Sequence, residues 1–240
     1  MVGHGTLGGS TIPEEARVSG TTLSVRAVLL DMDGTLVNSD AVVERIWLRW
    51  AARHGLDPAA VLRVVHGRQG HLSMAILLPE RPMEENLADN RRMLAEESAD
   101  VDGVVAVPGA AELLGALVGA PHALVTSADD TLARVRMAAA GLPLPPLMVT
   151  AEHVTASKPD PEGFLTAASR LGMDPADCLV LEDSEAGIAA GLAAGMRVLG
   201  IGHRAAAFEP TFHALDLSGI GLARSADGTM TLTLTNHAPV

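Results

Sequence analysis

The chain has 240 residues, of which 48% are hydrophobic and 2% aromatic, and its formal net charge is −12. This length suits one α/β domain, or one domain with a smaller insert, and the hydrophobic content is sufficient for a core. The negative charge argues against nucleic acid or an anionic membrane surface as a partner, because both require a basic protein surface.

The composition also favours a cytoplasmic protein. Cys178 is the single cysteine, so it cannot form an internal disulfide, and it lies in an apolar run. The chain does not open on a basic segment followed by an apolar one, as a secretory signal does, and no run is long and apolar enough to cross a bilayer. We expect a cytoplasmic monomer or weak dimer.

The N-terminal half predicts a leader, one strand and a helical module. Residues 1–24 are rich in Gly, Ser and Thr without periodic apolar positions, which predicts a flexible leader, and the apolar run 25–30 predicts a buried strand. Apolar residues at helical spacing predict helices over 40–54, 57–65 and 82–98, with a loop at 66–71. Residues 40–105 thus form a mainly helical module without a good central strand.

From residue 107 onward, helices alternate with strands. Helices are predicted over 108–118, 129–141, 160–172 and 184–195, and apolar strands over 122–126, 146–151, 178–183 and 196–202. This alternation predicts a doubly wound parallel sheet covered on both faces. The strand at 25–30 belongs to the same sheet, so the core comprises 25–39 and 106–220 with the module 40–105 inserted as a cap. Residues 221–240 predict a C-terminal hairpin or tail that turns at Asp227 and Gly228.

Polar residues gather where the predicted strands end, which is where open α/β sheets bind ligands. These residues are Asp31, Asp33, Thr126, Ser127, Lys158, Glu182 and Asp183. Lys158 stands out because it is the only lysine among 17 basic residues. Clustered carboxylates suit Mg²⁺, while the hydroxyls, the lysine and the loop amides after Asp33 are donors for an anion. A site that offers both ligands for a cation and donors for an anion suits phosphoryl transfer with an aspartate nucleophile.

Four segments, "DMDGTLVNSD", "VTS", "SKPDPEGF" and "LEDSEAGIAAG", resemble in order and spacing the four motifs of the haloacid dehalogenase-like hydrolases. The resemblance covers roughly residues 25–205. It implies a Rossmann-like core with a helical cap inserted after the first motif, in agreement with the pattern of predicted elements.

The resemblance also implies roles for the residues at the strand ends. Asp31 would be the nucleophile and Asp33 the general acid and base, Thr126 would bind the phosphoryl group, and Lys158 would neutralise charge between nucleophile and phosphate. The Mg²⁺ ligands would be Asp31, the Asp33 carbonyl and Asp183, with Glu182 as a ligand or behind one. Gly34, which lets the loop turn, and Ser127 are further candidates for substrate binding.

Finer similarity points to the sugar phosphatases. The segments "AVVERIWLRWAARHGL", "VVHGRQ", "VTAEHVTASKPDPEGF" and "GLAAGMRVLGI" look like bacterial sugar phosphatases related to the yeast 2-deoxyglucose-6-phosphate and glycerol-phosphate phosphatases. The implied substrate is a small sugar or polyol phosphate. The cap loop would meet it, so His66, Arg68 and Gln69 are candidate substrate contacts.

Several alternatives are weighed by residue type. β-Phosphoglucomutases have a histidine in the first cap helix, where this chain has Val43, and a lysine in the cap, where this chain has none. A mutase is therefore disfavoured but stays an alternative. Dehalogenases of the superfamily lack the counterpart of Asp33, and phosphonate hydrolases require a cap lysine. A phosphoglycolate-type phosphatase stays open. A non-catalytic phosphosugar-binding module is disfavoured because binding alone needs no nucleophile.

Overall fold

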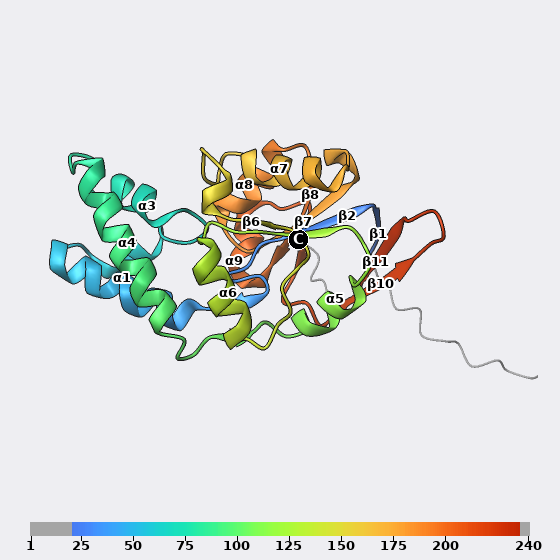
Figure 1. The fold of residues 1–240 in the computed structure, drawn as a ribbon, viewed down its shortest axis with the longest axis horizontal. Coiled ribbons are helices and arrows are strands. Elements are labelled where there is room, and N and C mark those ends of the chain that lie inside the picture. Colours follow the sequence, from blue (N-terminus) through green and yellow to red (C-terminus); the bar gives the residue numbers. More distant parts are fainter. Residues whose placement is uncertain (1–20, 236–240) are drawn as a thin grey trace, which may run out of the picture.

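The centre of the molecule is a parallel sheet of six strands. The computed structural model describes residues 21–235, and the strand order is β6-β5-β2-β7-β8-β9 (Figure 1). The strands are β2 (Ala27–Leu30), β5 (His122–Val125), β6 (Met148–Val149), β7 (Cys178–Glu182), β8 (Arg197–Ile201) and β9 (Phe212–Ala214). Every neighbouring pair is parallel. The predicted doubly wound α/β fold is confirmed.

Helices cover both faces of this sheet because the strands are apolar on both sides. The helices are α5 (Ala110–Ala116), α6 (Asp130–Ala139), α7 (Glu162–Leu171) and α8 (Glu185–Ala193). Figure 1 shows α7 and α8 on one face and α5 and α6 on the other. Alternate strand residues face opposite layers: Leu29 packs in the cluster that contains Phe164 of α7, whereas Leu30 packs in the cluster that contains Leu132 of α6.

The cap consists of helices alone. They are α1 (Asp40–His54), α2 (Pro58–Leu62), α3 (Gly70–Leu77) and α4 (Met83–Ala99). The two chain segments that join cap and core pair with each other as the short antiparallel strands β3 (Val37–Asn38) and β4 (Val105–Ala106). The predicted loop 66–71 extends too far, because α3 already begins at Gly70. A Cβ at Gly70 would overlap the Asn90 side chain, so this glycine serves close packing of α3 on α4.

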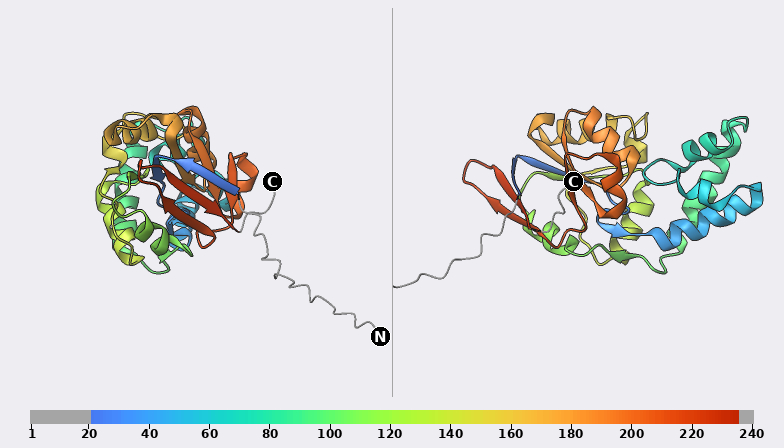
Figure 2. Two further views of the ribbon diagram at one scale, coloured as in Figure 1. Left: turned by 90° about the vertical axis from the view of Figure 1, so that its right-hand side faces the viewer. Right: turned by 180° about the vertical axis from the view of Figure 1, so that it is seen from behind.

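A second sheet lies at the opposite end of the molecule from the cap (Figure 2). It contains β1 (Thr21–Val25), β11 (Met230–Leu234) and β10 (Ile220–Arg224), all antiparallel. Within the described residues, β10 and β11 pair as a hairpin, and residues 21–24 of the expected leader lie in β1. The predicted strand 25–30 is divided, because Val25 pairs with Met230 in this sheet while β2 starts at Ala27. Residues 1–20 and 236–240 lie outside the described residues.

Short helical turns complete the core. They are η1 (Ala151–His153), η2 (Pro175–Asp177), α9 (Gly202–Ala205) and η3 (Ala206–Phe208). Within residues 21–235, no helix combines the length and the apolar character needed to cross a bilayer.

Candidate active site

The site begins where β2 ends. Asp31 follows Leu30 directly, and its backbone N–H donates to the Leu181 carbonyl of the neighbouring strand β7 (3.0 Å). The chain then turns sharply, with the Met32 carbonyl accepting hydrogen bonds from the amides of residues 35–37. Gly34 has φ +86°, a conformation that favours glycine. This turn brings Asp33 back to the same edge of the sheet as Asp31.

Lys158 connects three of the segments that meet at this edge. Its ammonium donates to Asp31 Oδ1 (2.6 Å), Glu182 Oε1 (2.8 Å) and the Val125 carbonyl (3.1 Å). The side chain is 6% exposed. Burial by itself would lower the Lys158 pKa, but the carboxylates of Asp31 and Glu182 raise it above its ordinary value. Lys158 is thus a protonated point charge held against Asp31.

Glu182 is fully buried behind this lysine. Its Oε1 accepts from Lys158, and its Oε2 accepts from the Ser184 amide (2.7 Å) and the Ser184 hydroxyl (2.9 Å). Helix α8 packs directly on it, because a Cβ at Gly187 would overlap the Glu182 carboxylate. Since protein donors engage both of its oxygens, Glu182 is suited to holding Lys158 in place.

Three buried carboxylates form a cluster that fits a divalent cation. One oxygen from each of Asp31, Glu182 and Asp183 lies within 4.8 Å of the others. Burial and the neighbouring Glu182 raise the pKa of Asp31 well above its ordinary value and that of Asp183 to about 7. Asp31 Oδ2 and Asp183 Oδ1 accept no hydrogen bond within the described part of the chain. Because Lys158 and Ser184 engage both oxygens of Glu182, Asp31 and Asp183 are the carboxylates with an oxygen available to a cation. Two such ligands suit Mg²⁺, which would reduce the repulsion within the cluster.

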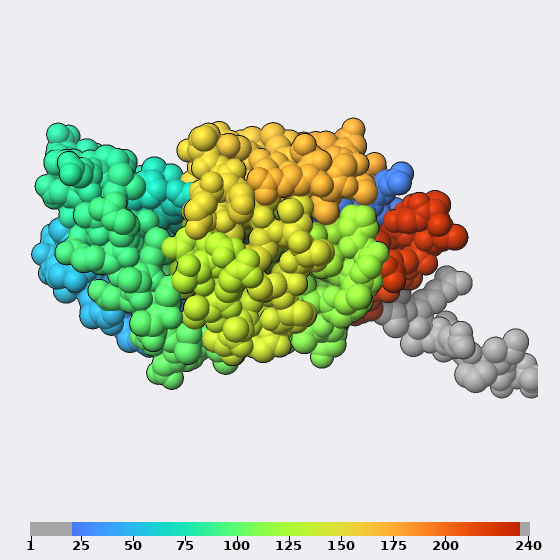
Figure 3. Space-filling view, viewed as in Figure 1, coloured from blue at the N-terminus to red at the C-terminus, as the bar shows by residue number. Residues whose placement is uncertain are grey.

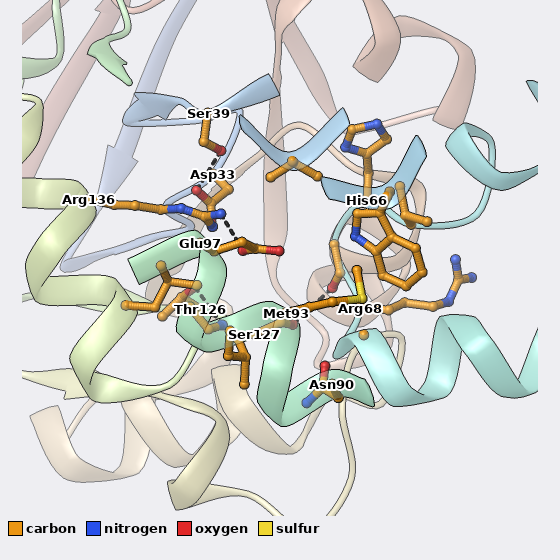
Figure 4. Close-up of a pocket in the computed structure, with 18 of the residues that line it drawn as sticks. Asp33, Ser39, His66, Arg68, Asn90, Met93, Glu97, Thr126, Ser127 and Arg136 are labelled. Carbon is orange, nitrogen blue, oxygen red and sulfur yellow. Dashed lines mark hydrogen bonds and ion pairs between the residues drawn. The ribbon is translucent and has the colours of Figure 1, made fainter. Parts of the chain in front are cut away.

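Asp33 has different partners from Asp31. Its Oδ1 accepts from the Ser39 hydroxyl (2.7 Å), and its Oδ2 accepts from Arg136 Nη1 of α6 (2.6 Å). The second amino group of Arg136 donates to Glu97 of the cap helix α4 (2.5 Å), as Figure 4 shows. Burial raises the pKa of Glu97 to about 6, against the opposing effect of the Arg136 guanidinium.

The two hydroxyl residues after β5 are both engaged with the protein. Thr126 Oγ1 accepts from the Ala128 amide (3.1 Å), and Ser127 Oγ donates to the Gly67 carbonyl of the cap (2.9 Å). Both line the cavity between core and cap. The Ser127 hydroxyl proton is committed to the cap loop, and its role toward substrate stays a prediction.

The cap loop 66–69 lies directly on the core. His66 Nε2 is 3.2 Å from Arg204 Nη1, and because arginine can only donate, the histidine nitrogen accepts. The Gln69 backbone N–H donates to Ser157 Oγ (3.2 Å), and Gln69 borders a smaller pocket beside Lys158. Arg68 lines the main cavity across from Asp33 (Figure 4). The structure thus brings this loop to the site, while its contacts with substrate stay predictions.

Several polar residues of the site were not predicted. Ser39, Arg136, Glu97 and Asn90 line the cavity, and Arg204 donates to Asp183 Oδ2 (2.8 Å) and to Asp40 (3.3 Å). One of them carried a detectable sequence signal. Arg136 lies four residues after Leu132 on the otherwise apolar buried face of α6. A charge within an apolar stripe indicates a buried ion pair or a site. Glu97 carried no such signal, because the buried face of α4 is itself largely polar, with Asn86 and Asp89 beside Met93.

Comparison with known proteins agrees with this geometry. The family model described as haloacid dehalogenase-like hydrolase matches residues 25–195. The chain is 41% identical over 194 residues to hexitol phosphatase A of Escherichia coli, covering 80% of this chain and 89% of that protein. It is 31% identical over 191 residues to glycerol-1-phosphate phosphohydrolase 2 of Saccharomyces cerevisiae, covering 75% and 76%. Its fold is similar to the crystal structure of β-phosphoglucomutase from Clostridium difficile (TM-score 0.71, 20% identity, 81% and 92% covered).

Proposed function

Because this chain belongs to the haloacid dehalogenase-like hydrolase family, we propose that it is a Mg²⁺-dependent phosphatase that hydrolyses small sugar or polyol phosphates through an aspartyl-phosphate on Asp31. The family inferred from the four motifs is confirmed. The names of the curated relatives, among them a hexitol phosphatase and a glycerol-1-phosphate phosphohydrolase, support the substrate class.

The observation that carries the proposal is the setting of Asp31. One of its oxygens is held by Lys158 at 2.6 Å, and the other accepts no hydrogen bond within residues 21–235. A carboxylate fixed on one side and free on the other is oriented for attack on phosphorus. Lys158 balances the negative charge that a bound phosphate would bring.

The reaction follows in two balanced steps. Asp31 Oδ2 forms a bond to phosphorus as the bond between phosphorus and the substrate oxygen breaks, and Asp33, which enters this step protonated, gives its proton to the departing alcohol. Asp33 then takes a proton from water, whose oxygen attacks phosphorus and releases phosphate from Asp31. Mg²⁺, held by Asp31, Asp183 and the Asp33 carbonyl, would neutralise charge on the phosphoryl oxygens.

Phosphate release from a panel of hexitol, glycerol, hexose and glycolate phosphates tests the proposal. We expect turnover of sugar or polyol phosphates with Mg²⁺, none in excess chelator, and none by Asp31→Asn. Acid quenching with ³²P-labelled substrate should leave label on the wild-type protein but not on Asp31→Asn. A preference for phosphoglycolate would contradict the substrate class, and binding without turnover would make the chain a phosphosugar-binding module. Conversion of β-glucose 1-phosphate into glucose 6-phosphate would identify a mutase.

A further inference from the structure

A chain of three charged residues, buried at Arg136 and Glu97 and partly exposed at Asp33, links the cap to the proposed acid and base. Glu97 belongs to α4 of the cap, Arg136 to α6 of the core, and Asp33 to the loop after β2. Arg136 donates to Glu97 at 2.5 Å and to Asp33 at 2.6 Å, and Figure 4 shows the guanidinium between the two carboxylates. The space-filling view shows the cap abutting the segment that contains α6 on this side of the molecule (Figure 3).

The burial of Arg136 is costly and therefore calls for an explanation. Only 3% of Arg136 and 8% of Glu97 is exposed, and Arg136 Nε has no hydrogen-bond partner in the described residues. Replacing a buried ion pair by apolar residues is often neutral or stabilising, so stability alone is a poor reason for one on an otherwise apolar helix face. The orientation of the Arg136 guanidinium is instead fixed by Glu97 on one side and by Asp33 on the other.

Asp33 is tied to both ends of the cap. Ser39, which holds Oδ1, directly precedes the first cap helix α1. Arg136, which holds Oδ2, is itself held by the last cap helix α4. The position of this one carboxylate therefore depends on how the cap sits on the core.

We propose that Arg136 is a positioning residue for Asp33 and that Glu97 of the cap holds Arg136 in place. Proton transfer to the leaving alcohol then depends on the docking of α4 against α6. This inference rests on the proposed phosphatase function. The rival explanation is an ion pair that only holds cap and core together.

Leaving-group chemistry separates the two explanations. A sugar or polyol alkoxide is a poor leaving group and needs the proton from Asp33, whereas p-nitrophenolate leaves without one. The ratio kcat/KM reports the steps up to departure of the leaving group, before water attacks. A defect in the position of Asp33 should therefore lower kcat/KM for a sugar phosphate far more than for p-nitrophenyl phosphate.

The test uses the variants Glu97→Gln, Arg136→Met and Asp33→Asn, with Asp100→Asn as the matched control. Asp100 follows the last turn of α4 and pairs with Arg45 at 2.8 Å, but both side chains are about one-third exposed and outside the cavity. We expect Glu97→Gln and Arg136→Met to lower kcat/KM for the best sugar phosphate at least about tenfold, within the roughly 10²–10⁴-fold that proton transfer supplies. Their effect on p-nitrophenyl phosphate should stay within about threefold, and Asp100→Asn should change neither value.

A second arm distinguishes lost positioning from poor folding, because a folding defect would lower activity in every background. Glu97→Gln introduced into Asp33→Asn should cause no further loss in kcat/KM for the sugar phosphate, because the group it positions is gone. Equal losses on both substrates, or an additional loss in the Asp33→Asn background, would overturn the positioning role while leaving the phosphatase function intact. Absence of phosphate release by the wild-type enzyme from every sugar phosphate would overturn both.

Discussion

Asp31 and Asp33 are two residues apart, yet their carboxylates have different partners. Asp31 faces Lys158 and the acidic cluster, whereas Asp33 faces Ser39 and Arg136. The turn between them makes this separation possible. It requires a residue at position 34 that tolerates a positive φ and leaves space for the Asp183 carboxylate. Glycine meets both conditions because it has no Cβ.

Gly34→Ala should therefore damage metal binding. The added Cβ would overlap the Asp183 carboxylate, and displacement of a ligand or its support typically lowers metal affinity roughly 10- to 100-fold. The measurement is the Mg²⁺ concentration that gives half-maximal phosphate release. Gly195→Ala is the matched control, since Gly195 has φ +74° and an added Cβ there would have nothing within 4 Å. Equal Mg²⁺ requirements for the two variants would contradict this role of Gly34.

Cys178 should be chemically inert in the folded protein. The residue is fully buried, and burial raises the pKa of its thiol to about 11. At pH 8 about one thiol in a thousand is then the reactive thiolate. We expect a thiol-reactive disulfide reagent to modify the native protein very slowly at pH 8 and to modify one thiol per chain after unfolding. Rapid stoichiometric reaction of the native protein would show that the thiol is accessible.

At the scale of elements, the parallel strands explain why distant segments share one site. Their carboxyl ends lie at the same edge, so Asp31, Thr126 and Asp183 gather there although each follows a different strand. The three-stranded sheet lies at the far end of the molecule and contributes to the core instead. One of its faces is buried through Leu23, Leu232 and Leu234.

Leu232→Ala should destabilise the protein without affecting catalysis. The side chain is fully buried, and truncating such a leucine costs about 2–5 kcal/mol of unfolding free energy. Thr233→Ala on the opposite face is the control and should change stability by less than about 0.5 kcal/mol. Urea unfolding measures both. We expect kcat/KM of folded Leu232→Ala to equal that of the wild type, and a selective loss of activity would show that this sheet influences the site.

At the scale of the whole molecule, the proposed chemistry resides in the core, while the cap closes the cavity above it. Cap and core are joined by more than the β3–β4 pair. Ser127 binds the Gly67 carbonyl, Arg204 bridges Asp183 to Asp40, and Arg136 bridges Asp33 to Glu97. Cap residues thus contact both the hydroxyl residue after β5 and the charged residues at the base of the cavity.

Arg68→Ala should alter selectivity more than chemistry. Arg68 lines the cavity on the cap side, and one hydrogen bond from a charged group contributes about 1.5–3 kcal/mol. We expect KM for sugar phosphates to rise roughly tenfold or more, with KM for p-nitrophenyl phosphate changed less than about twofold. Arg63→Ala, an exposed arginine outside the cavity, is the control. Equal increases for both substrates would remove Arg68 from the specificity site.

The sequence by itself determined the parts of this protein that depend on local pattern. Helical spacing and apolar runs predicted the alternating core and the helical cap, and the residues after the strands predicted that four carboxylates and Lys158 gather at one edge of the sheet. These signals are local because strand and helix periodicity, capping residues and turn glycines act within a few positions.

Only the tertiary structure decided which distant groups pair. Arg136 and Asp33 are 103 residues apart, and β1 pairs with β11 at the other end of the chain. Neither pairing has a local signature, since each depends on how packed layers bring remote segments together. The charge of Arg136 within an apolar stripe indicated burial, but its partners follow from the packing of α6 against α4 and against the loop after β2. For this reason the motifs predicted the candidate reacting residues, whereas the groups that contact the Asp33 carboxylate became visible only in the folded molecule.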